Sequence, residues 1–114
     1  MRLAQTLDEG LLPRPRVLVH ATKPDKDFVG VLDLLVPRVD AVIETWVIGL
    51  ADPRDVVHRA VLVARPGMTV EVEPDLAMAV RRARTLAGAS GSVLIAGSLY
   101  LVGAALGGRP WEDA

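Results

Sequence analysis

The sequence contains no cysteine and few aromatic residues, with two tryptophans, one tyrosine and one phenylalanine among 114 residues. The absence of cysteine excludes a disulfide scaffold, a thiol nucleophile and a zinc site built from thiolates. It also fits a reducing compartment, so we expect a cytoplasmic protein. The first ten residues lack the apolar core of a signal peptide.

Neither sign of charge dominates the chain. Thirteen Lys and Arg residues are interspersed with fourteen Asp and Glu residues, which gives a net charge of −1. We therefore expect no nucleic-acid partner, because such proteins concentrate positive charge on one face. The two histidines, His20 and His58, have no third ligand at metal spacing, so we expect no metal site.

The longest uncharged segment, residues 85–108, is long enough to cross a bilayer. Its glycine- and serine-rich part, residues 88–92, reads as a loop that divides it. A buried strand followed by a short helix explains this segment better than a membrane span. The chain also lacks GxxxxGK[ST], GxGxxG and GxSxG, which argues against a phosphate loop, a dinucleotide fingerprint and a nucleophile elbow.

Apolar residues, which make up 51% of the chain, fall in a pattern of alternating strands and helices. Short apolar or alternating runs predict strands at 17–19, 40–45, 69–73 and 92–96, with helices between them. Such alternation favours a mostly parallel sheet of about four strands in a Rossmann-like three-layer α/β domain. We expect one domain over residues 1–114, with residues 107–114 as a tail.

The helix starts carry clear signals. Asp25 can cap a helix that Pro37 closes, and Asp52-Pro53 and Pro74-Asp75 open two more. The spacing predicts that the helix after Pro53 faces the core with a stripe of five residues: Val56, Val57, Ala60, Val61 and Ala64.

Two strand-to-helix turns are candidates for function, because ligands bind beyond the carboxyl ends of parallel strands. In the first, Gly97 permits a close backbone approach, Ser98 can cap a helix whose amides suit an anion, and Tyr100 adds a phenol. The second turn holds Asp25, Lys26 and Asp27, and His20 just before it is a candidate for lining the same cleft. The alternative is that these side chains only cap helices and pack at the sheet edge.

Both turns resemble the C-terminal domain of folylpolyglutamate synthase/dihydrofolate synthase, in the Mur ligase superfamily. The match comprises GSLYLVG at 97–103 after the strand SVLIA, DKD at 25–27 after a VLV strand, and VEVEPDLAMAV at 70–80. In that family an ATP-binding domain and this domain enclose a cleft where L-glutamate is joined to folates with ATP and magnesium. The resemblance implies that Ser98 and Tyr100, with Lys26 and Asp27, lie on the glutamate side of that cleft.

The chain also departs from the family pattern. It has no P-loop domain and no DGAHNP-type motif, Ala21 stands where the family has glycine, and Pro24 stands where it has a basic residue. We therefore expect no catalytic residue and no cofactor in this chain, with ATP and magnesium supplied only by a completing domain. Three hypotheses remain: a truncated or separately encoded C-terminal domain that pairs with an ATPase domain, a standalone binding module, and a degenerate domain that interacts with a partner or with itself.

Overall fold

The computed structural model describes residues 5, 7–10, 12–22, 28–46 and 49–97. Four strands, β1 (Arg16–Ala21), β2 (Ala41–Trp46), β3 (Thr69–Asp75) and β4 (Ser92–Gly97), form one sheet in the order β3-β2-β1-β4, and every pair is parallel. The predicted strands are confirmed, each with small changes at its ends.

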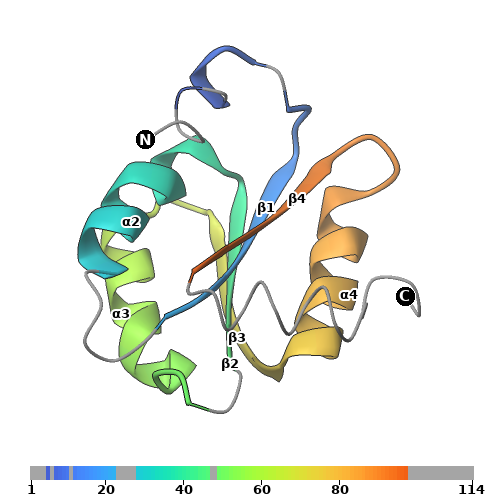
Figure 1. Ribbon diagram of the computed structural model, residues 1–114. Coiled ribbons are helices and arrows are strands. Elements are labelled where there is room, and N and C mark those ends of the chain that lie inside the picture. The colour runs from blue at the N-terminus through green and yellow to red at the C-terminus, as the bar shows by residue number, and fades with distance from the viewer. Residues whose placement is uncertain (1–4, 6, 11, 23–27, 47–48, 98–114) are drawn as a thin grey trace.

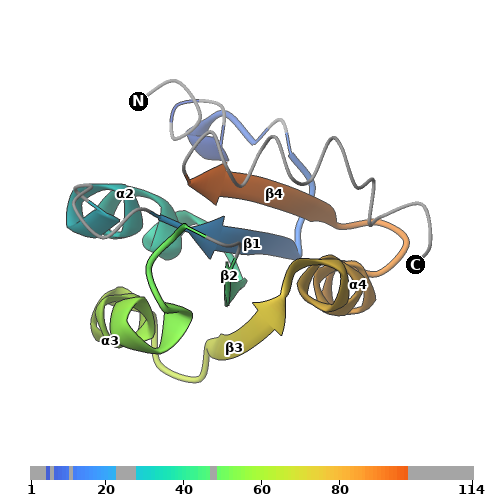
Figure 2. The same ribbon diagram turned by 60° about the horizontal axis from the view of Figure 1, so that its bottom comes forward.

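Helices cover both faces of the sheet and make the three layers that the sequence predicted (Figure 1). The helices α2 (Phe28–Leu35) and α3 (Pro53–Val63) lie on one face, and α4 (Leu76–Ala87) lies on the other, as Figure 2 shows. A short 3-10 turn, η1 (Val36–Arg38), follows α2 and contains Pro37.

Alternation along the strands divides the core into two halves. Leu18, Val42 and Leu94 pack under α2 and α3. Val17, Val19 and Ile43 pack under the small residues of α4. Because β1 and β2 are covered on both faces, four of the six residues in each strand are apolar, as is typical of central parallel strands.

Capping residues predicted from the sequence mark the starts of α3 and α4. The side chain of Asp52 accepts from the Arg54 backbone N–H, and Asp75 accepts from Met78 N–H. The stripe predicted for α3 was partly wrong, because Val61 is 57% exposed. The buried side is Pro53, Val56 and Ala60, and the extra 100° of helix rotation after Ala60 carries Val61 toward solvent.

The amino edge of the sheet is held by charged groups. Asp40 pairs with Arg14 and Arg65 and accepts from the Arg16 backbone N–H at 2.7 Å. Burial raises the pKa of Asp40, but the Arg16 N–H and the two guanidinium groups outweigh it, so the pKa is lowered overall. The side chain of Arg16 is itself buried and donates to three backbone carbonyls, those of Leu7, Leu12 and Arg38.

A candidate ligand cleft at the carboxyl edge of the sheet

The strand order identifies the crevice where a ligand would bind in this fold. The chain moves outward from β1 to β2 and β3, then returns so that β4 pairs with the other side of β1. Such a reversal leaves a crevice between the two strands at their carboxyl ends. Here the reversal lies between β1 and β4.

The two turns singled out in the sequence begin side by side at this crevice. In the register of the sheet His20 is the partner of Ala96 and Ala21 is the partner of Gly97. The segment that contains Lys26 and the segment that contains Ser98 therefore leave adjacent strands from the same edge. Five of the predicted site residues, Asp25, Lys26, Asp27, Ser98 and Tyr100, lie outside the described residues, so their roles remain predictions.

The loop after β2 folds back onto the carboxyl end of β1. Gly49 has a φ of 91°, a left-handed value that favours glycine, and so the chain can turn there. The Ala51 backbone N–H then donates to the Thr22 carbonyl at 2.7 Å, and Leu50 packs against Ala21. Thr22 is buried as a result, and this fixes the start of the second predicted turn, the one that follows β1.

The side chain of His20 is only 1% exposed, so it is buried beneath the surface of this cleft. Its Nδ1 lies 2.7 Å from Oε2 of Glu44, its register partner on β2. Glu44 is fully buried, and its other oxygen, Oε1, has no hydrogen-bond partner among the described residues. Whether His20 acts on a ligand remains a prediction, and the pair itself was not foreseen from the sequence.

A buried histidine–carboxylate pair is unusual in a sheet core, because ionisable groups lose hydration when they are buried. The pair lies on the sheet face that carries Leu18 and Val42, two residues before β2 ends at Trp46. Within the segment DAVIET, one feature indicates that Glu44 is buried: it follows Val42 by two residues and therefore lies on the same face of the strand. The signal that could have revealed the pair was the parallel register of the two strands.

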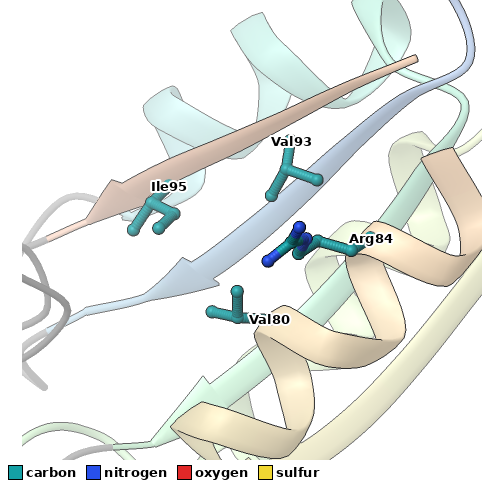
Figure 3. Close-up of a pocket in the computed structure, with 4 residues that line it drawn as sticks. All are labelled: Val80, Arg84, Val93 and Ile95. Carbon is teal, nitrogen blue, oxygen red and sulfur yellow. The ribbon is translucent and has the colours of Figure 1, made fainter. Parts of the chain in front are cut away.

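An apolar hollow of about 350 Å³ lies beside β4 on the α4 face. Its lining residues are Val80 and Arg84 of α4 and Val93 and Ile95 of β4. Figure 3 shows the Arg84 side chain leaving α4 and extending between Val80 and Val93. This hollow lies beside an edge strand, because β4 is at one end of the described sheet.

Two comparisons with known proteins gave no match: no family model and no curated protein is similar to this chain. The search of solved structures did find similar folds. The fold matches part of folylpolyglutamate synthase. A Mycobacterium tuberculosis folylpolyglutamate synthase complexed with ADP and AMPPCP aligns with a TM-score of 0.77 and 29% identity over 90% of this chain. The same organism's enzyme complexed with ADP aligns with a TM-score of 0.78 and 27% identity over 92% of this chain.

The chain spans about a quarter of the length of those two structures, 25% and 26%. The Rossmann-like α/β fold predicted from the sequence is thereby confirmed, as is the similarity to this ligase. Among the described residues no helix is long and apolar enough to cross a membrane. Within the same residues no group of three or more His, Asp or Glu side chains could hold a metal ion.

Proposed function

We propose that this chain is a C-terminal domain of the folylpolyglutamate-synthase type, which provides the glutamate-binding wall of a ligase cleft. The observation that carries the proposal is the pairing of Ala21 with Gly97. In that register β1 and β4 end side by side, and the two turns whose sequences resemble the ligase family follow these two strand ends. The fold likeness to the M. tuberculosis enzyme supports the same assignment.

ATP and magnesium would belong to a second domain. The chain has no GxxxxGK[ST] motif, and no described cluster suits a metal ion, so we assign no nucleotide or metal step to it. Its own contribution would be to hold glutamate. In this proposal a carboxylate of glutamate accepts hydrogen bonds from the backbone N–H and the hydroxyl group of Ser98 and from the hydroxyl group of Tyr100. Lys26 adds positive charge beside it. The activity would then require a separately encoded or linked P-loop ATPase domain.

The test is calorimetric titration of the chain with L-glutamate, alone and together with a P-loop domain of this ligase type. We expect saturable binding that Ser98→Ala weakens. Ser90→Ala is the matched control, because Ser90 is exposed in the turn between α4 and β4 at the opposite edge of the sheet. The proposed glutamate wall would be excluded if Ser98→Ala and Ser90→Ala bound glutamate equally well. It would also be excluded if glutamate gave no binding heat with the chain, either alone or together with the P-loop domain.

A second candidate, an interaction module, is favoured by the hollow of Val80, Val93 and Ile95 at the edge strand. Apolar surface at a sheet edge is typical of a protein contact. If this is the main role, Ile95→Lys should abolish self-association or partner capture in light scattering, whereas Ser98→Ala should not. A chain that stays monomeric and captures no partner in the unmodified form would rule this role out.

A further inference from the structure

The two edges of the sheet differ in how they are protected from other chains. The β3 edge carries Glu71 and Glu73, and the register between β2 and β3 shifts just before β3 ends, next to Pro74. Charged side chains, prolines and bulges are features that keep an edge strand from pairing with another chain. The β4 edge has none of them, because SVLIAG contains no charge and no proline and pairs with β1 in one unbroken register. The sheet therefore leaves β4 as the edge that another segment can cover.

The apolar hollow beside this edge, which we call the β4 hollow, shows that α4 covers β4 only in part. Val93 and Ile95 face the same side of the sheet as Val17 and Val19, but they are half-buried, whereas the two valines of β1 are fully buried. The hollow that Val93 and Ile95 line has a volume of about 350 Å³. That volume is at the low end for small-ligand pockets, so it suits one large side chain.

The walls of the β4 hollow favour an occupant that combines an aromatic ring with a negative charge. Val80, Val93 and Ile95 provide apolar contacts, and Arg84 adds a positive charge. In Figure 3 the Arg84 side chain extends across the space between Val80 and Val93. A guanidinium is attracted to the face of an aromatic ring, most strongly to an indole, and it also pairs with carboxylates. An indole next to a carboxylate would use both properties of Arg84.

The chain itself contains such a segment. Its tail, residues 107–114, carries Trp111 followed by Glu112 and Asp113. The tail is long enough to reach the hollow, because Val93 lies only about 13 Å back along β4 from Gly97, at about 3.3 Å per residue. Residues 98–110 would extend about 20 Å even as a continuous helix, and further in any more open form.

The covalent link to β4 favours this tail over a second copy of the protein as the occupant. A short tether gives the tail an effective concentration of about 1 mM. For a contact with a Kd of about 0.1 mM, the tail would then fill about 90% of the hollows, whereas a second copy at about 10 µM would fill only about 10%.

We propose that the C-terminal tail docks in the β4 hollow, with the Trp111 ring against Arg84 and the aliphatic walls, and with Glu112 or Asp113 beside the guanidinium. Docking covers the apolar side of an unprotected edge and makes the hollow an internal contact of the chain. It also restrains both ends of the segment between β4 and the tail, which includes residues of the proposed glutamate wall. That last link rests on the proposed function, but docking itself is tested without glutamate.

The first experiment measures the exposure of Trp111 in the full chain. Trp46→Phe leaves Trp111 as the only indole, so its fluorescence can be quenched with acrylamide and compared with that of N-acetyl-tryptophanamide. We expect quenching several-fold weaker than that of the free amide and unchanged on dilution, because the contact lies within one chain. Quenching equal to that of the free amide would overturn the proposal. Protection that disappears on dilution would also overturn it, because a second copy would then be the occupant.

Two variants in the same background test the role of Arg84. Arg84→Gln should lower the ratio of docked to undocked tail by about 2- to 5-fold, the effect of losing one exposed cation–π contact or ion pair. Arg82→Gln is the matched control, because it makes the same charge change on the same helix, but Arg82 pairs with Glu71 of β3 instead. The proposed contact is wrong if the two variants quench equally. Circular dichroism of each variant shows that the fold is retained.

The absence of natural cysteines allows an independent test by cross-linking. Arg81→Cys places a thiol on an exposed position of α4, one turn before Arg84, and Asp113→Cys places the other in the tail. A short bis-maleimide should join these two thiols within one chain. It should not join the control pair His58→Cys and Asp113→Cys, because His58 is exposed on α3 at the opposite face of the sheet. Cross-linked dimers, equal yields from both pairs, or no product from the first pair would each overturn the proposal.

Discussion

The buried pair of His20 and Glu44 gives the sharpest prediction about stability. We expect His20→Leu to destabilise the protein by about 3–5 kcal/mol, because it leaves a buried carboxylate without its partner. Both side chains are at most 1% exposed, the two atoms lie 2.7 Å apart, and Glu44 Oε1 already lacks a partner among the described residues.

That loss is large compared with the whole stability of the domain. At about 0.05–0.15 kcal/mol per residue, a chain of this size has about 6–17 kcal/mol in total. The double variant His20→Leu/Glu44→Leu should recover most of the loss, since replacing both partners of a buried hydrogen bond with apolar groups of similar shape can be nearly neutral or stabilising. It removes both polar groups together, and neither is left in the sheet without its partner.

Urea denaturation followed by circular dichroism measures His20→Leu, Glu44→Leu and the double variant, which together complete a double-mutant cycle. The control is Arg59→Ala, which breaks the half-exposed pair between Asp33 and Arg59 on the facing helices α2 and α3. That change should cost no more than about 1 kcal/mol, as exposed pairs do. The reasoning would be refuted if His20→Leu cost as little as Arg59→Ala, or if the double variant were less stable than both single ones.

Three further predictions concern acid, caps and close packing. Hydrogen bonds from Arg54 lower the pKa of the exposed Asp52 from 3.8 to about 2. A carboxyl group whose pKa is lower in the folded state stabilises the fold at pH values above its pKa in the unfolded state, and this stabilisation is lost as the pH falls. The contribution of Asp52 should therefore disappear between about pH 4 and pH 2. NMR titration of Asp52 checks this, and a midpoint near 3.8 would contradict it. Asp75→Ala should cost about 1 kcal/mol in thermal unfolding, because α4 loses the acceptor for Met78 N–H, whereas Asp75→Asn should cost much less. Gly91→Ala should cost at least about 1–3 kcal/mol, since a Cβ there would collide with the carbonyl oxygens of Ala87 and Pro15, and Ala89→Ser in the same exposed turn is the control that should change little.

Most of the fold could be predicted from local signals. Asp52-Pro53 and Asp75 mark helix starts by the chemistry of their side chains, and the run Val17-Leu18-Val19 indicates a strand covered on both faces. The exposure of Val61 could not be predicted, because a stripe of five apolar residues is wider than the face that the sheet covers. The angle at which α3 packs decides which of them is buried.

The candidate site was predictable only in part. The turns after Ala21 and Gly97 were chosen for their residues, but only the strand order shows that they are adjacent. The His20–Glu44 pair depends on the register between β1 and β2, which lie more than twenty residues apart in sequence. A histidine and a glutamate at isolated positions carry no local signal for each other, because pairing of parallel strands is set by the tertiary structure.

The position of β4 beside β1 has a consequence for how the protein is made. β1 has no neighbour on one side until Ser92 and the residues after it have left the ribosome, and the Ser92 hydroxyl then donates to the Pro13 carbonyl across 79 residues of sequence. Contacts between such distant parts of a chain form late and slowly. During synthesis β1, β2 and β3 can associate first, with the unpaired backbone edge of β1 exposed to chaperones and to other nascent chains. The crevice between β1 and β4 therefore comes into existence in the same step that protects this edge, so any partially synthesised chain would lack both.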